Sequence, residues 1–551
     1  MRSCLRIASL AVMAAVLPGT VLAQATIAGT VKDPSGGVLP GVTVDVSSPV
    51  LIEKTRTALT DGTGQYRVVD LLPGTYSVTF ALTGFTTVKR DGVEVSGAGV
   101  FTINADLRVG AVAETITVTS ETPVVDIQSA RQQAVLSNET LSTLPSVRGY
   151  GSLLNAIPAM QGGNLGSGIS NTSNGVAAGA GGTFFNAYGG RPNEGRVNWD
   201  GLNLGGAYNG GGLGFAPDPS AAEEMQVTLA GQLGQSETGS ATINFVPKSG
   251  GNTFKGSAYG AYAGSGLVGS NLDDTLRSYG ITQSGLVVQW DASGQLGGPI
   301  KRDRLWFFAN VRNVGSSSTI PGIYANANAG SAASWTYVRD TTVTARSAAA
   351  TQDFLGRLTA QVSPRNKVNF SFDEQFQCTG SSYLTDSSGT CRSRGTDWIA
   401  NGSATAAPES SSLYNNNLPN SVTQATWQAA VTSRLLLEAG MSSFNSQWGW
   451  TRPPGALTNF TPVTELAPAT VGVPFPVFTY RGLDNLLSND QHQHNWRASV
   501  AYVTGAHNFK IGYQGSIALD NQHNLVNDTQ LTYTFLAGQP ISFNERIGPW
   551  N

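Results

Sequence analysis

The sequence has little charge, and this absence excludes one class of partner. Only 13% of its 551 residues are Asp, Glu, Lys or Arg, about half the share usual in soluble domains, and the formal net charge is −3. Proteins that bind nucleic acid need a basic field, which this composition does not supply. We therefore expect no nucleic-acid partner.

Long apolar runs are also absent. Beyond the N-terminal signal-like stretch, no segment approaches the roughly 18 consecutive apolar residues of a membrane-spanning helix. Glycine is abundant, with 66 residues, and 9% of the residues are aromatic, whereas disordered chains have few aromatics and high net charge. These features predict a long, glycine-rich, mostly β protein.

The N-terminus has the pattern of an export signal. Arg2 and Arg6 precede a short apolar run at 8–17, and Val21-Leu22-Ala23 has the character of a cleavage site. The run is too short for a membrane anchor. We predict a cleaved signal peptide over residues 1–23 and a mature chain that starts at Gln24.

Cysteine is scarce, with three residues in all, and Cys4 is removed with the signal. Cys378 and Cys391 remain in one long predicted loop of an exported protein, where disulfides persist. We predict a disulfide between them that closes a loop of about 14 residues and contributes roughly 3 kcal/mol if unstrained. Two free thiols are the alternative.

Residues 24–110 contain short β runs separated by Gly and Pro turns, a pattern typical of a small antiparallel sandwich. The segments 29–33, 39–42, 60–66 and 72–76 resemble the carboxypeptidase regulatory-like domain, which implies a transthyretin- or starch-binding-like β-sandwich. Zinc peptidase chemistry needs His and Glu ligands, and all four His lie at or beyond His492. We expect no enzyme activity, no metal site and no cofactor.

Residues 129–252 are rich in glycine and poor in acid–base candidates, and they follow a linker at 111–128. A low-complexity linker would lack the ordered apolar pieces found here. Their order resembles the plug domain of TonB-dependent outer-membrane receptors of the Oar-like group, in which a regulatory-like sandwich precedes an α+β plug. Asp200-Gly201 also predicts a tight turn between two strands. The plug-motif residues are Arg148, Gly149, Arg191, Pro192, Asn193, Asp200 and Gly201.

One polar–apolar segment lies in the predicted linker. An exposed extended strand can pair with an open sheet edge of a partner. The resemblance implies that this segment is a TonB box that pairs with the periplasmic TonB protein; the alternative is the last strand of the sandwich. Its residues are Glu114, Thr115, Ile116, Thr117, Val118 and Thr119.

Residues 253–551 alternate apolar and polar residues in runs of about ten, for instance Phe370 and Phe372 against Asn369 and Ser371. Short turns and long loops also alternate, an asymmetry typical of a barrel in outer-membrane lipid. The short turns are predicted near 363–366, 432–434 and 504–506, and the long loops at 316–350, 378–420 and 450–490.

The strand arithmetic predicts the N-terminal half of a large antiparallel transmembrane β-barrel. About 300 residues carry ten or eleven candidate strands, whereas plugged transporters use about 22. We expect these 551 residues to be a fragment that does not insert stably alone, because an open edge leaves backbone groups unpaired in lipid. A closed ten-stranded barrel is the alternative, although its lumen is small for a plug.

Two weak patterns need separate interpretation. His492 and His494 share one face of a strand, so they are either a metal-binding pair or two polar residues at the lumen or rim. Residues 264–269 fit G-x-G-x-x-G, but a dinucleotide site needs a strand before the motif and a helix after it, so we expect a loop.

Two functional hypotheses follow. The resemblance implies an exported outer-membrane transporter that binds an extracellular ligand and takes up a large nutrient (siderophore chelate, glycan or peptide) with energy delivered through TonB from the proton-motive force. The alternative is a passive adhesin or carbohydrate-binding surface protein. An adhesin has no need of a plug, which favours the transporter.

Overall fold

The computed structural model describes residues 25–545 with gaps. Undescribed within that range are 34–35, 52–53, 72–73, 96–99, 109–114, 120–131, 144–152, 155–156, 164–183, 192–193, 205–214, 216, 232–235, 237, 271, 279–284, 380–404, 412–414, 418–419, 433, 451–456, 484 and 505–506. The predicted signal peptide at 1–23 therefore lies outside the described residues. None of the described helices is long and apolar enough to cross a membrane.

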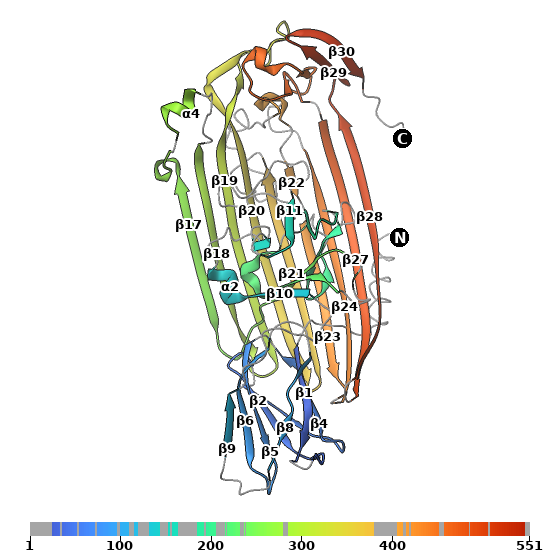
Figure 1. Ribbon diagram of the computed structural model, residues 1–551. Coiled ribbons are helices and arrows are strands. Elements are labelled where there is room, and N and C mark those ends of the chain that lie inside the picture. Colours follow the sequence, from blue (N-terminus) through green and yellow to red (C-terminus); the bar gives the residue numbers. More distant parts are fainter. Residues whose placement is uncertain are drawn as a thin grey trace.

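The first unit is a two-sheet β-sandwich, the lowest part of Figure 1. One sheet has the order β4-β1-β7, with β8 also paired to β1, and the other has the order β3-β2-β5-β6-β9. Alternate residues point into a core that includes Val44, Val46, Val78 and Phe80. The strands are β1 (Ala25–Lys32), β2 (Thr43–Ser47), β3 (Thr55–Leu59), β4 (Gln65–Leu71), β5 (Gly74–Ala81), β6 (Thr87–Val95), β7 (Val100–Thr102), β8 (Ala105–Asp106) and β9 (Thr115–Thr119).

The second unit is an α+β plug. Its main sheet has the order β10-β15-β16-β13-β14, and β11 pairs with β12 in a separate hairpin. Figure 1 shows these elements inside the curve of the long strands. The elements are β10 (Gln132–Ser137), α2 (Asn138–Thr143), β11 (Met160–Gly163), β12 (Phe184–Ala187), β13 (Arg196–Trp199), β14 (Leu202–Asn203), the 3₁₀ turn η2 (Pro219–Ala221), β15 (Ala222–Ala230) and β16 (Thr242–Pro247).

The third unit is a curved antiparallel wall. Its ten-stranded sheet runs β17-β18-β19-β20-β21-β22-β24-β27-β28, and β23 also pairs with β21 and β24. Among the described strands, β28 does not pair with β17. The strands are β17 (Lys255–Gly264), β18 (Leu286–Lys301), β19 (Leu305–Asn326), β20 (Arg339–Ser363), β21 (Asn366–Thr379), β22 (Asn415–Asn417), β23 (Asn420–Ala430), β24 (Leu435–Trp450), β27 (Asn485–Thr504) and β28 (His507–Val526). The expected mostly β class, with sandwich, plug and partial barrel, is confirmed.

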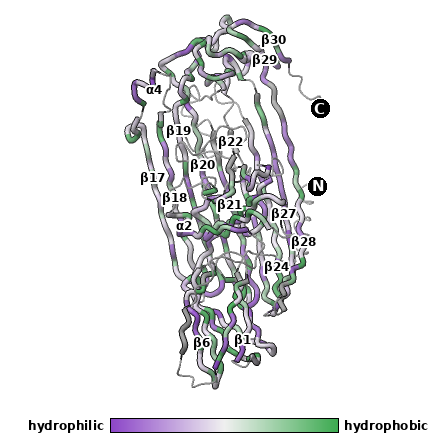
Figure 2. Tube along the Cα trace, in the orientation of Figure 1, coloured by the Kyte–Doolittle hydropathy of each residue, from purple (hydrophilic) through white to green (hydrophobic). Residues whose placement is uncertain are grey.

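The two faces of the wall have opposite polarity. On β21, Phe370 is 45% exposed on the outside, while Asn369 and Ser371 are 3% and 5% exposed on the inside. Short hydrophilic and hydrophobic stretches alternate along the wall strands in Figure 2. On β28 the outward apolar residues run from Phe509 to Leu519, and eleven residues of a tilted strand span the apolar part of a bilayer. The predicted alternation is confirmed, with the apolar side facing outward.

The predicted short turns are flanked by strand ends that lie at one end of the wall, next to the sandwich (Figure 1). The predicted long loops differ from the structure. β19 continues to Asn326 and β20 begins at Arg339, so only 327–338 connects them, and 450–490 contains β25, β26 and the start of β27. Ser, Asn and Gly favour loops in isolation, but here they continue strand pairing beyond the apolar band. Most of 378–420 lies outside the described residues.

The far end of the wall is covered by a small cap with its own apolar core. Its sheet has the order β26-β25-β29-β30, and Tyr337, Val463, Phe478 and Tyr480 are among its buried residues. This cap is not among the units predicted from the sequence. Its elements are β25 (Val463–Glu465), η5 (Pro468–Val471), β26 (Phe478–Tyr480), β29 (Leu531–Leu536) and β30 (Gln539–Glu545), with η4 (Pro408–Ser410) against it; two short helices, η3 (Ser265–Leu267) and α4 (Asp274–Ser278), follow β17.

Candidate functional site

The Asp-Gly turn of the plug points at the wall. Asp200 and Gly201 have φ of 49° and 70°, and Trp199 pairs with Leu202, so these two residues form the tight turn between β13 and β14 that the sequence predicts. Asp200 N–H donates to the carbonyl of Phe245 at 2.9 Å, which ties the turn to β16. A Cβ on Gly201 would come within 2.6 Å of Arg497, so glycine also permits the close approach to the wall.

Two wall arginines hold this turn. Arg357 on β20 donates to the carboxylate of Asp200 at 2.5 Å, and both side chains are only 4% exposed. Arg497 on β27 donates to the backbone carbonyls of Asp200, at 2.9 Å, and of Gly201. Burial raises the pKa of Asp200, and the positive charge of Arg357 opposes that shift. The turn therefore bridges the plug to two wall strands that are far apart in the sequence.

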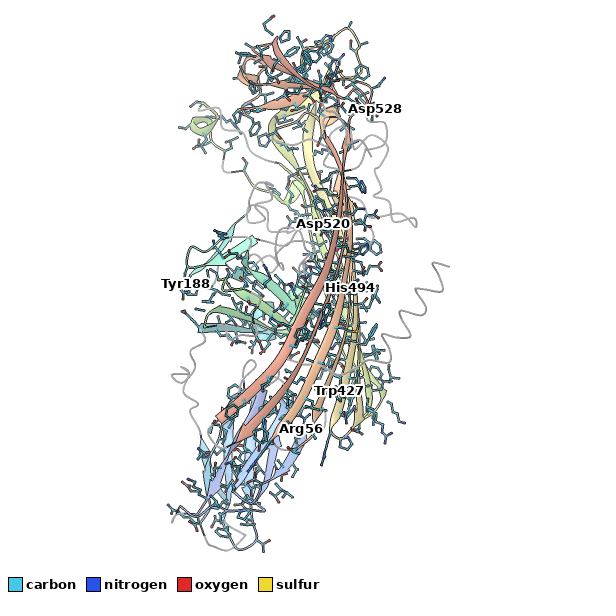
Figure 3. All side chains as sticks on the ribbon, turned by 90° about the vertical axis from the view of Figure 1, so that its right-hand side faces the viewer. Arg56, Tyr188, Trp427, His494, Asp520 and Asp528 are labelled. Atoms are coloured by element: carbon cyan, nitrogen blue, oxygen red, sulfur yellow. The ribbon has the colours of Figure 1, made fainter. Side chains whose placement is uncertain are left out.

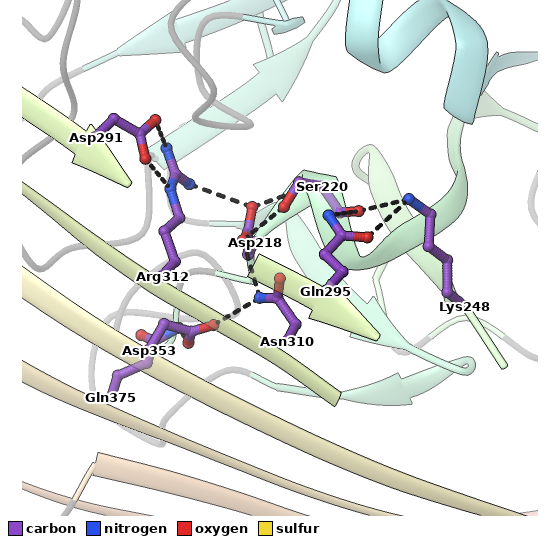
Figure 4. A network of polar contacts seen from close by, with 9 residues as sticks. All are labelled: Asp218, Ser220, Lys248, Asp291, Gln295, Asn310, Arg312, Asp353 and Gln375. Atoms are coloured by element: carbon purple, nitrogen blue, oxygen red, sulfur yellow. Dashed lines mark hydrogen bonds and ion pairs between the residues drawn. The ribbon is translucent and has the colours of Figure 1, made fainter. Parts of the chain in front are cut away.

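A second contact lies on β18 and β19 (Figure 4). Asp218 caps η2 by accepting from Ser220 N–H at 2.9 Å, and its other contacts reach the wall. Arg312 donates to Asp218 at 3.2 Å and to Asp291 at 2.9 Å. Asn310 donates to Asp218 at 3.1 Å. The carboxylate of Asp218 thus stabilises the 3₁₀ turn of the plug and also binds the plug to the wall.

Backbone groups of the plug make further contacts. Lys248 Nζ and Gln295 Nε2 both donate to the carbonyl of Ser220, at 2.8 and 3.0 Å (Figure 4). On the other side of the plug, Asn495 donates to the carbonyl of Asn203 at 3.1 Å. The plug core also extends onto four buried wall side chains, which are Phe308, Leu355, Val422 and Phe444. The attachment therefore combines many directed polar contacts with a small apolar patch.

Most of these wall residues are not among the site residues predicted from the sequence. Arg312 and Arg357 each occupy an inward position next to an outward apolar one, as Arg357 does beside Leu358. A charged residue at an inward position of a strand with an apolar outward face was the available signal. The alternation of apolar and polar residues identifies the inward face of a strand, but it does not predict which plug group a charged residue on that face contacts.

The sandwich contacts the wall at the same end as the short turns. Arg434, between β23 and β24, forms an ion pair with Asp61 and donates to Thr63 Oγ1 at 2.8 Å. Burial raises the pKa of Asp61, but hydrogen bonds from Thr63, Gln65 and Arg434 outweigh it, so the pKa lies below its ordinary value. This ion pair stabilises the docked sandwich when Asp61 is charged.

We expect acid to weaken this docking. Because the pKa of Asp61 is lowered on folding, its contribution is present above its ordinary value of 3.8 and is lost as the pH falls through the lowered pKa. Arg434→Gln should move the pKa of Asp61 upward, only part of the way, because the Thr63 and Gln65 hydrogen bonds remain. A ¹³C NMR titration of the Asp61 carboxyl measures this shift, and an unchanged pKa in the variant would contradict it.

The other predicted site residues are only partly described. Glu114, Arg148, Gly149, Pro192, Asn193 and Cys391 lie outside the described residues, and Cys378 lies near the end of β21. Arg191 is exposed and its guanidinium lies 3.8 Å from the carboxylate of Glu194, within the plug. The predicted disulfide and the motif role of these residues stay predictions.

The TonB-box segment forms an edge strand. Thr115–Thr119 is β9, which pairs in parallel with Thr87–Asp91 of β6 at the end of its sheet. It thus extends the sandwich sheet, as the alternative interpretation has it, although it lies in the predicted linker 111–128. A strand at a sheet edge also has the geometry that strand addition requires.

The histidine pair lies on the outward face of β27. His492 Nδ1 is 2.8 Å from Asn445 Oδ1 and its Nε2 is 3.3 Å from Asp490, while His494 is exposed (Figure 3). The described residues contain no group of three or more metal-ligating side chains. Residues 264–269 form the end of β17, η3 and a following loop.

Two comparisons bear on the family. Residues 26–108 match the carboxypeptidase regulatory-like domain. The chain is 28% identical over 303 residues to the TonB-dependent transporter Oar of Myxococcus xanthus, which covers 52% of this chain and 26% of that protein. The resemblance to Oar-like TonB-dependent receptors is confirmed. The chain thus spans about a quarter of the Oar transporter's length.

Solved structures show weaker likenesses. The outer-membrane transporter YddB of Escherichia coli aligns with 75% of this chain and 51% of its own, at 14% identity and a TM-score of 0.45. A mutant of the ferric enterobactin receptor of Pseudomonas aeruginosa aligns with 71% of this chain and 49% of its own, at 11% identity and a TM-score of 0.43. The Oar relative is a transporter, in agreement with the expectation that this chain is not an enzyme.

Proposed function

We propose that this protein acts in TonB-dependent transport across the outer membrane, taking up a large nutrient such as a siderophore chelate, a glycan or a peptide. The observation that carries the proposal is a plug bound inside a wall that is apolar outside and polar inside. Such a wall suits lipid on one face and a water-filled lumen on the other. We also propose that the signal at 1–23 exports the protein and that the ligand binds at the cap end of the wall.

The contacts between the plug and the wall are of a kind that allows the plug to be displaced. Most of them are hydrogen bonds and ion pairs, such as Asp200 with Arg357 and Asp218 with Arg312. When such contacts open into a wet lumen, water replaces each partner, so the net free energy lost is smaller than the gross interaction energy. A pull on the plug can therefore open contacts one after another.

The proposed coupling element is Glu114–Thr119. β9 pairs with β6 and ends its sheet in the described part of the sandwich, so a strand of TonB could add to the outer edge or replace β6. The division into a sandwich (24–110), coupling segment (111–128), plug (129–252) and partial barrel (253–551) is proposed on the same basis.

We expect Ile116→Pro to abolish uptake while ligand binding survives, because proline removes a ladder donor and fixes φ. Ile116→Val is the matched control, since it keeps the N–H and the β-branched shape, and it should transport normally. Uptake and cell-surface binding of a labelled nutrient are measured in cells carrying each variant.

Dissipating the proton-motive force in wild-type cells should have the same effect as Ile116→Pro. Uptake that persists in both conditions would contradict the proposed coupling. Surface binding with no uptake under any condition would instead identify a passive adhesin.

A further inference from the structure

A cavity of about 380 Å³ lies between the sandwich and the turn end of the wall. β1, β3 and β4 line it from the sandwich, and the ends of the wall strands line it from the other side. Figure 3 shows Arg56 at this junction. The charged residues that line the cavity are Arg56, Arg67, Arg365, Lys367, Asp303 and Glu438.

The lining has more positive than negative groups, and its carboxylates already have partners. Glu438 accepts from Ser499 at 3.0 Å and from Lys510, outside the cavity, at 3.1 Å. Asp303 accepts from Asn252 at 2.6 Å. Neither carboxylate is hydrogen-bonded to Arg67 in the described structure.

Arg67 has two buried hydrogen-bond donors that lack acceptors within the described part of the chain. Its Nε and Nη1 are buried and have no hydrogen-bond partner among the described atoms, and its Nη2 reaches only Thr26 Oγ1, at 3.5 Å. Burial lowers the pKa of Arg67, and the charge of Glu438 offsets this in part. These two atoms have almost no accessible surface, so a ligand in the cavity meets them only after the Arg67 side chain shifts. Because leaving charged donors buried and unpaired is costly, a shift of the guanidinium toward an acceptor in the cavity is favoured.

We propose that this cavity binds an oxyanion, the carboxylate or phosphate group of a small solute, through Arg67 from the sandwich and Arg365 from the wall. Guanidinium donors match carboxylate and phosphate oxygens in charge and geometry. Arg365 already donates to the carbonyl of Val431 at 2.9 Å, which orients its side chain at the wall turn. A ligand shared by both units stabilises the docked sandwich by mass action.

Isothermal titration calorimetry with inorganic phosphate and with citrate tests the site. The protein is purified at its natural length from outer membranes into a non-ionic detergent. We expect saturable binding of at least one of them in the wild type. Arg67→Gln should weaken it at least about tenfold, and Arg365→Gln, on an exposed turn, should weaken it as well. Arg108→Gln is the matched control, because Arg108 is an exposed sandwich arginine outside the cavity, and it should bind like the wild type.

Arg67→Lys separates charge from the planar donors and should bind with intermediate affinity. Heat-modifiable mobility of the wall and protease resistance of the sandwich establish that each variant is folded. No saturable binding to the wild type, or equal binding to folded Arg67→Gln, would overturn the proposal. Binding of micellar phosphatidylglycerol without binding of either free anion would also overturn it, since the source would then be a lipid headgroup.

Discussion

Asp200→Asn should destabilise the attachment of the plug by about 3–5 kcal/mol, because it leaves Arg357 buried without its negative partner. Asn keeps the side-chain shape and tolerates positive φ, so the turn itself should persist. Both side chains of the pair are 4% exposed, which leaves little room for water to replace the carboxylate. Thermal unfolding of the purified protein, followed by calorimetry, measures the loss.

Asp274→Asn is the matched control. Asp274 pairs with Arg277 at 3.2 Å on α4, but these side chains are 99% and 60% exposed. A pair so open to water contributes about 0–0.5 kcal/mol, and the variant should unfold like the wild type. Equal effects of the two substitutions would show that Asp200 does not hold the plug to a buried arginine.

Val500→Arg should destabilise the inserted wall by about 2–4 kcal/mol, because it places a charge on the outward face within the apolar band. Val500 is 45% exposed on that face of β27, between Ala498 and Tyr502. Asn521→Arg lies on the same outward face of β28, beyond Leu519, where the outward apolar residues end and where arginine costs about 0–1 kcal/mol. Urea-induced unfolding in lipid vesicles compares the two variants, and equal destabilisation would argue against a band of limited depth.

The parts of the fold with a local signal could be predicted from the sequence. The period-two pattern of the wall identifies its strands and, with Asn369 buried and Phe370 exposed, its apolar outward face. Asp200-Gly201 identifies a turn because the backbone angles of that turn suit these residue types. The close spacing of Gly and Pro likewise indicates the short strands of the sandwich.

The remaining parts depend on contacts between segments far apart in the chain. The cap core joins Tyr337 to Phe478, with ring centroids 5.0 Å apart, although neither segment shows a pattern different from a polar loop. Asp218 meets Arg312 only because the plug is placed inside the wall, and no local rule pairs residues 94 positions apart. The buried, unpaired donors of Arg67 likewise could not be predicted, because the sequence shows Arg67 only as a polar residue of a sandwich strand.

The central claim is that the wall has lipid on one side and the plug on the other. Photo-crosslinking from p-benzoylphenylalanine placed at Phe370 or at Gln424 in cells tests it most directly. Phe370 is exposed on the outer face, whereas Gln424 is 1% exposed and donates to the carbonyl of Trp199 in the plug at 3.3 Å. We expect the probe at Phe370 to label lipid and the probe at Gln424 to label the plug peptide around 196–204. Labelling of the plug from Phe370, or of lipid from Gln424, would contradict the account.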